Sequence, residues 1–274
     1  MPENPRGQPL PEAQTRDRHA LYQQSVQDVG AEIDFVDATF AAYQGRPAKL
    51  LREDFCGTAN SACEWVRRGD GRRAVAVDLD PRVLDWGRQH NVTLLAANLR
   101  KNIELNVADV REVLRPKVDI VLAMNFSYYL FLTRSAMLEY FRGVRKSLLP
   151  GGLFFLDAYG GYDAPREIIE PRECGDFTYI WEQASFNPIN AQMQCYIHFE
   201  FPDGSRMDRA FSYYWRLWTP PEIREMLAEA GFSRSDVYWE GTDEETGEGD
   251  GEFTCSEVGD ADPGWIAYII AEPG

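Results

Sequence analysis

The stretch that decides the expected fold is Leu51-Arg52-Glu53-Asp54-Phe55-Cys56-Gly57-Thr58-Ala59-Asn60. It predicts a short strand at 50–54, followed by a turn and a helix that continues to about residue 68. Gly57 has no Cβ, so the backbone of this turn can come close to a ligand. A second strand, predicted at 74–78, ends at Asp78. A strand–helix–strand unit of this length is typical of a parallel sheet.

The alternation of strands and helices continues on both sides of this unit. Further strands are predicted at 103–107, 118–124 and 153–157. Helices are predicted at 19–43, 81–90 and 133–148. The strands are nearly continuous apolar runs, which indicates a parallel sheet covered on both faces. The expected fold class is therefore α/β, with a Rossmann-like, doubly wound, mostly parallel sheet.

The pattern changes after the fifth strand. Three longer strands are predicted at 177–186, 193–201 and 207–218. The segments that join them, 187–190 and 202–205, contain the Asn, Pro, Asp and Gly residues of hairpin turns. These features predict an antiparallel three-stranded β insertion at about 174–218.

The C-terminal part adds one helix and two strands. Thr219-Pro220-Pro221-Glu222 is a capping box that begins the helix, and Gly231 ends it. The final strands are predicted around 237–239 and 265–271. The acidic connection at 240–264 is expected to be solvated and mobile, and it is long enough to act as a lid. The domain prediction is a disordered tail at 1–18 and a single domain at 19–274.

The net charge of the chain favours some classes of binding partner over others. The chain has 28 Lys and Arg against 44 Asp and Glu, a net charge of −16. From Glu240 to Gly274 there are 11 acidic residues and no Lys or Arg. Binding to a phosphate backbone needs a basic field, so nucleic acid is disfavoured as a partner. A small neutral or cationic molecule is the expected substrate.

Length and cysteine usage favour a cytoplasmic protein with a buried core. The 274 residues are 44% hydrophobic, but no apolar run reaches the roughly 18 residues of a membrane-spanning helix. The N-terminus has no signal-peptide core. Five scattered cysteines without a C-x-x-C pair favour reduced thiols. His19, His90 and His198 also lack the spacing of metal ligands, so no metal site is predicted. No membrane partner is predicted, because no apolar run is long enough to span a bilayer.

Carboxylates follow three successive predicted strands. Glu53 precedes the first turn, Asp78 ends the second strand 21 residues after Gly57, and Asp109 follows the third. A carboxylate at the end of the second strand can accept both hydroxyls of a ribose. A nicotinamide dinucleotide would need a G-x-G-x-x-G cradle for its pyrophosphate, whereas here two acids come shortly before a single glycine. A cofactor with an ammonium and a ribose but no phosphate fits better, and S-adenosylmethionine is such a molecule.

On these residues the sequence resembles the class I S-adenosylmethionine-dependent methyltransferases, from about Lys49 to Ala271. The resemblance rests on five segments in the order of that family, at 53–59, 75–81, 108–110, 119–129 and 148–152. The three later strands and the stretch 213–217 are similar to the glycine N-methyltransferase-like type, in which such an insertion helps to cover the active site. The chain departs from the usual G-x-G-x-G, because Phe55 and Ala59 replace the first and third glycines.

The resemblance implies a role for each matching residue. The cofactor-binding residues would be Glu53, Gly57, Asp78, Leu79, Asp109, Val110, Asn125 and Phe126. Glu53 would meet the ammonium group, Asp78 the ribose and Asp109 the adenine amine. Val110 would donate its backbone N–H, while Asn125 and Phe126 would face the methionine portion.

The acceptor side is predicted from aromatic residues. Tyr128, Tyr129, Tyr214 and Trp215 are the candidates for substrate binding, because ring faces attract cationic amines. The expected reaction is an in-line transfer of the methyl group to a small-molecule acceptor. An oxygen nucleophile would need a general base, for which Asp157 and Tyr128 both remain open. No catalytic residue is assigned.

Two alternative functions are also open. A non-catalytic protein that binds S-adenosylmethionine would keep the cofactor residues and transfer no methyl group. A nicotinamide-dependent oxidoreductase is disfavoured by the missing glycines. The acceptor, its reacting atom and the oligomeric state are not specified. Relatives of this type can exchange an N-terminal helix between subunits, so a homo-oligomer is one expectation.

Overall fold

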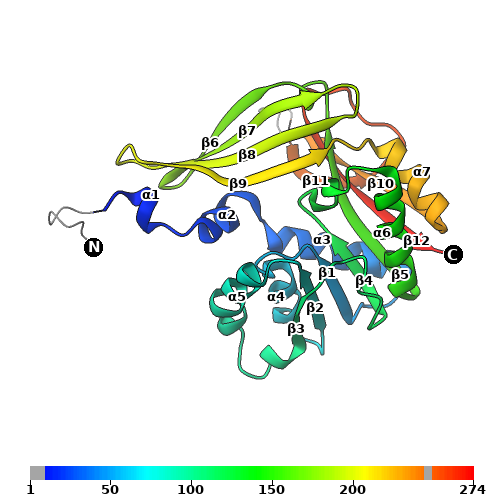
Figure 1. Cartoon of the computed structure of the whole chain (residues 1–274). Helices are drawn as coiled ribbons and strands as arrows, with labels where there is room; N and C mark the ends of the chain where they lie inside the picture. Colours follow the sequence, from blue (N-terminus) through cyan, green and yellow to red (C-terminus); the bar gives the residue numbers. More distant parts are fainter. Residues whose placement is uncertain (1–9, 244–248) are drawn as a thin grey trace. The chain divides into compact units, whose positions relative to one another are not determined.

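A computed structural model describes residues 10–243 and 249–274, which fall into two compact units (Figure 1). The β unit consists of the described residues up to Asp28 together with Pro165–Leu217. The α/β unit consists of Val29–Ala164 and Trp218–Gly274. The predicted site residues of the parallel sheet all belong to the α/β unit.

Among the described residues, the α/β unit contains an eight-stranded sheet in the order β11-β10-β12-β5-β4-β1-β2-β3. Its parallel strands are β1 (Leu50–Asp54), β2 (Arg73–Asp78), β3 (Ile103–Val107), β4 (Val118–Ala123) and β5 (Leu148–Gly160). Its antiparallel strands are β10 (Phe232–Thr242), β11 (Gly249–Cys255) and β12 (Trp265–Pro273). The predicted α/β class with a mostly parallel sheet is confirmed.

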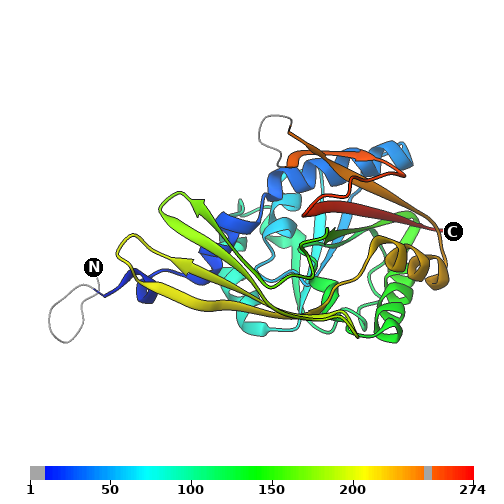
Figure 2. The same cartoon turned by 90° about the horizontal axis from the view of Figure 1, so that it is seen from above.

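Helices cover both faces of this sheet (Figure 2). They are α3 (Val29–Gln44), α4 (Asn60–Arg67), α5 (Pro81–His90), α6 (Arg134–Ser147) and α7 (Pro220–Ala230). Neighbouring side chains of a strand point to opposite faces. In β5, accordingly, Phe155 contacts Phe35 of α3, while Phe154 contacts Phe141 of α6. The predicted capping box of Thr219 and Glu222 begins α7, and Gly231 ends it with φ 97°.

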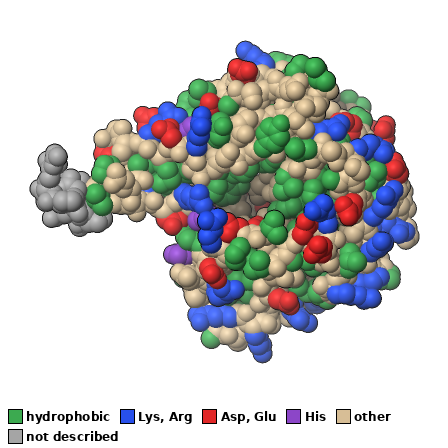
Figure 3. Space-filling view, viewed as in Figure 1, with side chains coloured by type: hydrophobic (Ala, Val, Ile, Leu, Met, Phe, Trp, Pro, Cys, Tyr) green, Lys and Arg blue, Asp and Glu red, His purple; other side chains and the backbone are tan. Residues whose placement is uncertain are grey.

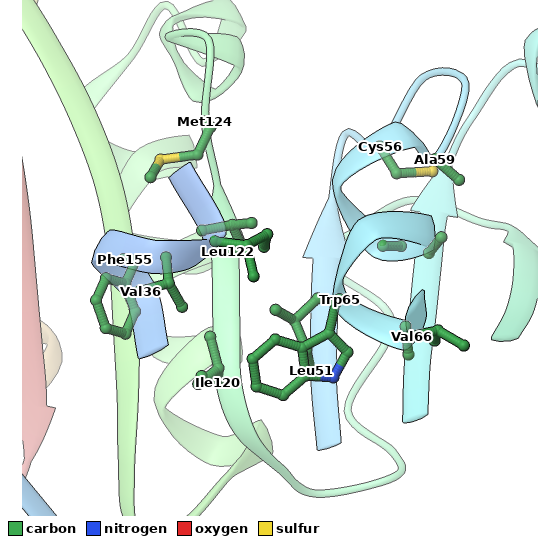
Figure 4. Close-up of a cluster of buried hydrophobic side chains, with 14 of the residues drawn as sticks. Val36, Leu51, Cys56, Ala59, Trp65, Val66, Ile120, Leu122, Met124 and Phe155 are labelled. Carbon is green, nitrogen blue, oxygen red and sulfur yellow. The ribbon is translucent and has the colours of Figure 1, made fainter. Parts of the chain in front are cut away.

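The core beneath α3 and α4 is drawn in Figure 4. Trp65 of α4 lies beside Leu51 of β1, and both are fully buried. The Trp65 Nε1 donates to the Arg73 carbonyl oxygen at 3.0 Å, so the indole is buried without an unpaired N–H. This packing fixes α4, and therefore the turn that precedes it, against the start of the sheet.

The β unit contains a four-stranded antiparallel sheet rather than the predicted three strands. Its strands are β6 (Ile168–Cys174), β7 (Phe177–Asn187), β8 (Gln192–Glu200) and β9 (Arg206–Arg216), in that order. The missed strand, β6, is an edge strand that is mostly exposed and contains Pro171. Exposed residues and proline weaken the alternating pattern from which a strand is predicted, and both are typical of edges.

The N-terminal part of the β unit also differs from the sequence expectation. The single helix predicted at 19–43 was wrong, because Gln27 is extended (ψ 116°) and separates α2 (Arg18–Val26) from α3. Within the tail predicted at 1–18, Glu12–Thr15 form the short helix α1. Residues 1–9 lie outside the described residues. Leu21 of α2 is buried in the core of this unit.

The acidic connection between the two final predicted strands was predicted to be solvated. Part of it instead forms an additional strand, β11. β11 pairs antiparallel with β10, with Glu240 opposite Phe253. The Phe253 ring lies 4.2 Å from that of Tyr268 and 5.9 Å from that of Phe35. These ring contacts hold β11 at the edge of the sheet, whereas its other residues are exposed and gave no alternating pattern.

Candidate active site

The predicted cofactor residues meet at one edge of the parallel sheet. Glu53 lies at the end of β1, Asp78 is the last residue of β2, and Asp109 follows β3. Asn125 follows β4, which is the other neighbour of β1. The connections from β1 and β4 leave toward opposite faces, so this is the point at which open α/β sheets bind ligands.

The turn after β1 keeps the backbone of a glycine-rich loop although it has one glycine. Phe55, Gly57 and Ala59 have φ of 56°, 52° and 56°. These are the three positions of the family pattern, and two of them lack the glycine that makes a left-handed φ inexpensive. Packing compensates at Phe55, whose ring contacts Tyr140 and Phe131 at 5.6 and 5.9 Å between centroids. Phe55 and Ala59 therefore adopt a left-handed φ although neither is a glycine.

Asp78 and α5 hold this turn in place. The Asp78 Oδ2 accepts the Gly57 N–H at 2.8 Å, and its Oδ1 accepts the Asp80 N–H at 2.9 Å. A Cβ on Gly87 of α5 would lie 2.3 Å from the Thr58 carbonyl oxygen, so only glycine allows this approach. Burial raises the pKa of Asp78, and the backbone N–H donors of Asp80, Gly57 and Leu79 oppose that shift. Asp78 thus positions the turn from the carboxyl end of β2.

Glu53 is a buried carboxylate next to a second acid. It is 7% exposed, and its Oε2 accepts the Ala62 N–H of α4 at 2.8 Å. Burial raises the pKa of Glu53 well above its ordinary value, and the charge of Glu32 on α3 raises it further, as does that of Asp78. A cation placed here would relieve this repulsion. Glu32 could not be predicted as a neighbour of Glu53, because it lies in a helix remote from every motif.

The neighbouring Asp54 has a different environment, as alternation along a strand requires. The Arg52 Nη2 donates to its Oδ2 at 2.9 Å, and the Tyr140 hydroxyl donates to the same oxygen at 2.9 Å. Arg52 and Asp54 both have fully buried side chains. Asp54 is therefore part of a buried ion pair beneath the turn, and Glu53 is the acid that remains for a ligand.

Leu79 adds exposed apolar surface directly after β2, whereas Val110, after β3, is buried. Leu79, directly beyond Asp78, is 70% exposed. Val110 is 6% exposed. Between them in sequence, Asp109 forms a bidentate ion pair with Arg111, at 3.0 Å for Nε and 2.6 Å for Nη2. Arg111 lowers the pKa of Asp109, and this pairing was not predicted from the sequence.

The turn after β4 is held by Asp157 of β5. Asn125 and Phe126 both have left-handed backbones, with φ of 58° and 53°. Their N–H groups donate to the two carboxylate oxygens of Asp157 at 2.6 and 2.9 Å. Burial raises the pKa of Asp157 to about 7, against the lowering effect of these bonds. Asp157 was a candidate general base, and the structure shows that its carboxylate positions this turn.

Tyr128 and Tyr129 are core residues in this structure rather than the lining of an open pocket. Both are 0% exposed. The Tyr128 hydroxyl donates to the Asp157 carbonyl oxygen at 2.5 Å, and the Tyr129 hydroxyl donates to that of Trp218 at 3.0 Å. Burial raises the pKa of Tyr128 well above its ordinary value, which makes it a poor base. Of the other two aromatic candidates, on β9 of the β unit, Tyr214 is exposed and Trp215 is 5% exposed.

The central part of the α/β unit matches a known family. Residues 54–156 match the family model described as "Methyltransferase domain". The chain carries a methyltransferase domain. The match runs from the last residue of β1 into β5, and it includes the predicted residues Gly57, Asp78, Asp109 and Asn125.

Solved methyltransferase structures have the same fold as the whole chain. An S-adenosylmethionine-dependent methyltransferase from Clostridium acetobutylicum ATCC 824 has 17% identity and a TM-score of 0.67, over 93% of this chain and 98% of that one. CalS10 from Micromonospora echinaspora, an amino pentose methyltransferase, has 18% identity and a TM-score of 0.62, over 91% and 95%. KedS8 from Streptoalloteichus sp. ATCC 53650, a sugar N-methyltransferase, has 16% identity and a TM-score of 0.61, over 94% and 93%. No curated protein matches the chain by sequence.

These findings favour the methyltransferase prediction over the two alternatives. The matched family is one of enzymes, and the turn after β1 has one glycine and buried acids where a dinucleotide cradle would need further glycines. Within 10–243 and 249–274, no helix is long and apolar enough to cross a membrane.

Proposed function

We propose that the methyltransferase domain transfers the methyl group of S-adenosylmethionine to an amine of a small molecule. The observation that carries the proposal is the convergence of Glu53, Asp78 and Leu79 on the turn after β1. An amine as the acceptor is supported by the similarity in fold to an amino pentose methyltransferase and a sugar N-methyltransferase.

The residues at this edge fit the chemical groups of the cofactor. The buried carboxylate of Glu53, close to the charges of Glu32 and Asp78, suits an ammonium group and would repel a phosphate. Each Asp78 oxygen accepts one backbone N–H and has a second lone pair for a ribose hydroxyl. The exposed face of Leu79 suits the adenine ring. Asp109 shares its carboxylate with Arg111, so its contact with the adenine amine remains a prediction.

The side chains of the domain have mainly a positioning role. When bound, S-adenosylmethionine supplies a methyl group already activated by a sulfonium, so catalysis consists of alignment and exclusion of water. Asp157 fixes Asn125 and Phe126, which are predicted to face the methionine portion. Because the carboxylate of Asp157 and the hydroxyl of Tyr128 already have partners, neither is assigned as a base. An amine that arrives neutral needs none.

A small molecule fits the surface better than a polyanion does. On the face drawn in Figure 3, Lys and Arg side chains are interspersed with Asp and Glu side chains and form no continuous basic band among the described residues. Binding to a nucleic-acid backbone requires such a band.

The experiment is a transfer assay with methyl-labelled S-adenosylmethionine and panels of amines, carboxylic acids and phenols. We expect label to appear in one or more amines. Binding of S-adenosylmethionine with no transfer to any class would support the non-catalytic alternative. Enhanced fluorescence of a reduced nicotinamide cofactor, with no binding of S-adenosylmethionine, would support the oxidoreductase.

Other predictions from the sequence belong with this proposal. We propose a cytoplasmic location, which is supported by five free cysteines. A homo-oligomer, contacts of Tyr214 and Trp215 with the acceptor, and the boundaries at 18, 19, 174 and 218 stay predictions. Size-exclusion chromatography with light scattering measures the oligomeric state directly.

A further inference from the structure

His198 on β8 is a buried histidine between two carboxylates of the β unit. The residue is 4% exposed. Its Nε2 lies 2.7 Å from an oxygen of Glu182 on β7, and its Nδ1 lies 3.2 Å from an oxygen of Asp208 on β9. The imidazole therefore connects a middle strand of the antiparallel sheet to both of its neighbours. None of these three residues belongs to the candidate active site.

The pairing of β8 with β9 is irregular opposite this ring. The residue pairs on either side of His198 are Ile197 with Phe211 and Phe199 with Met207. One residue of β8 therefore faces three residues of β9, 208–210, which form a β-bulge. Arg209 lies at the centre of this bulge with a left-handed φ of 49°, a conformation that is strained for a residue with a Cβ. The bulge consequently depends on contacts that hold its backbone.

The imidazole supplies one of these contacts. The Arg209 N–H donates to the Nδ1 of His198 at 3.1 Å. A ring nitrogen that accepts a hydrogen bond carries no proton, so the proton of the neutral ring is on Nε2, which donates to Glu182. The Arg209 guanidinium lies over the Tyr196 ring, 4.4 Å from its centroid. The neutral ring of His198 thus holds the strained backbone of the bulge.

Charged and titratable groups face the ring from all three strands. Among the described residues they are Glu182 of β7, Tyr196 and Glu200 of β8, and Arg206, Asp208 and Arg209 of β9. The Arg206 Nε pairs with Asp208 at 2.7 Å and keeps that exposed carboxylate near the ring. Arg18 of α2 contacts the bulge itself, since its Nη1 donates to the Ala210 carbonyl oxygen at 3.2 Å. The Nδ1 of His198 therefore has two competing neighbours, the N–H of Arg209 and the carboxylate of Asp208.

We propose that His198 is a pH-sensitive switch that closes and opens the bulge at 208–210. When Nδ1 takes a proton from solvent, it can no longer accept the Arg209 N–H, and it donates to the Asp208 carboxylate instead. The Arg209 N–H then loses its acceptor, and the bulge opens. Loss of the proton at higher pH restores the bond and closes the bulge. The switch lies within the β unit and does not depend on the proposed function.

The first test follows the ring and the backbone amide in one titration. The full chain, labelled with nitrogen-15, is taken from pH 8 to pH 5, the range in which histidine side chains commonly change charge. NMR spectra report which nitrogens of His198 carry a proton, and hydrogen exchange at the Arg209 amide is corrected for its intrinsic dependence on pH. We expect a neutral ring with its proton on Nε2 at pH 8. Once the ring is protonated, exchange at Arg209 should be at least about 10-fold faster.

Three results of this titration would overturn the proposal. One is unchanged exchange at Arg209 when the His198 ring becomes protonated. Another is a neutral ring whose proton is on Nδ1, because that nitrogen could not then accept the Arg209 N–H. The third is a ring that keeps a single protonation state from pH 5 to pH 8.

Two variants separate the switch from a general loosening of the protein at low pH. His198→Gln has no group that titrates in this range, so its corrected exchange rate at Arg209 should stay within about 2-fold from pH 8 to pH 5. Asp208→Asn removes the charged partner of the protonated ring, so the exchange transition should move to lower pH by about 0.3 unit or more.

Matched control variants have the same chemical change outside the switch. His90→Gln alters an exposed histidine on α5, and Asp176→Asn alters an aspartate that is also 69% exposed and paired with an arginine. Both should keep the wild-type transition at Arg209. A transition that persists in His198→Gln, or an unchanged midpoint in Asp208→Asn, would contradict the proposal. Because Asp208 is exposed, its variant decides the matter even if His198→Gln does not fold.

Discussion

Leu79→Ala should weaken cofactor binding without changing stability. Full burial of a leucine side chain contributes about 1.5–3 kcal/mol. Since 70% of Leu79 is exposed in the structure, covering that part with an adenine ring contributes at most about 1–2 kcal/mol. Loss of most of this contact corresponds to roughly a 5- to 30-fold rise in the Kd of S-adenosylmethionine. Isothermal calorimetry measures the Kd, and urea unfolding measures the free energy of unfolding.

Leu94 supplies the matched control for this prediction. It is a leucine of the same unit, 75% exposed, outside the edge at which the cofactor residues meet. Leu94→Ala should leave the Kd within 2-fold of the wild-type value. Equal Kd values for Leu79→Ala and Leu94→Ala would refute the placement of adenine on Leu79. If Leu79→Ala lowers the unfolding free energy and Leu94→Ala does not, Leu79 has a packing role instead.

Three further predictions concern the framework of the site. Asp157→Asn leaves one N–H of the turn after β4 without its acceptor, so it should cost about 1–3 kcal/mol of unfolding free energy. The pKa of Asp157 is raised from 3.8 to about 7 in the folded state, so its contribution to stability is present below pH 3.8 and is lost as the pH rises toward about 7. The unfolding free energy, measured with urea from pH 4 to 8, should therefore fall less in Asp157→Asn than in the wild type. Parallel pH profiles of the two proteins would contradict this. Asp54→Asn leaves the fully buried guanidinium of Arg52 without its counter-charge and should cost about 3–5 kcal/mol in the same assay, whereas a loss below about 1 kcal/mol would show that the ion pair is not needed. Thr219→Ala removes a capping box and should cost about 1 kcal/mol, measured as a lower urea midpoint with an unchanged slope; an unchanged midpoint would mean that α7 needs no cap.

The parallel sheet could be predicted because its signals are local. Apolar strands, helix caps and the turn at Gly57 each occur within a few residues, and all point to the same fold. The strands β6 and β11 could not be predicted in this way, since most of their residues are exposed. Edge strands obtain their pairing from a neighbour that is distant in sequence.

The residues of the site also fall into those that local sequence predicts and those that only tertiary packing brings together. Asp78 and Glu53 were predictable because each follows a strand at the carboxyl edge of the sheet. Glu32 and Arg111 were not predicted as neighbours of these acids, because their contacts depend on tertiary packing and on a rotamer. The role of Asp157 was also hidden, since only the structure shows two backbone N–H groups directed at its carboxylate.

Calorimetric titration with S-adenosylmethionine, of the wild type and of Glu53→Gln, tests the central claim most directly. The account predicts one cofactor per chain, and about a 10- to 100-fold loss of affinity in Glu53→Gln through the lost charge-assisted contact with the ammonium. Methylthioadenosine, which lacks the amino-acid portion, should bind both proteins equally. No binding to the wild type, or equal affinity of both proteins for S-adenosylmethionine, would contradict the account.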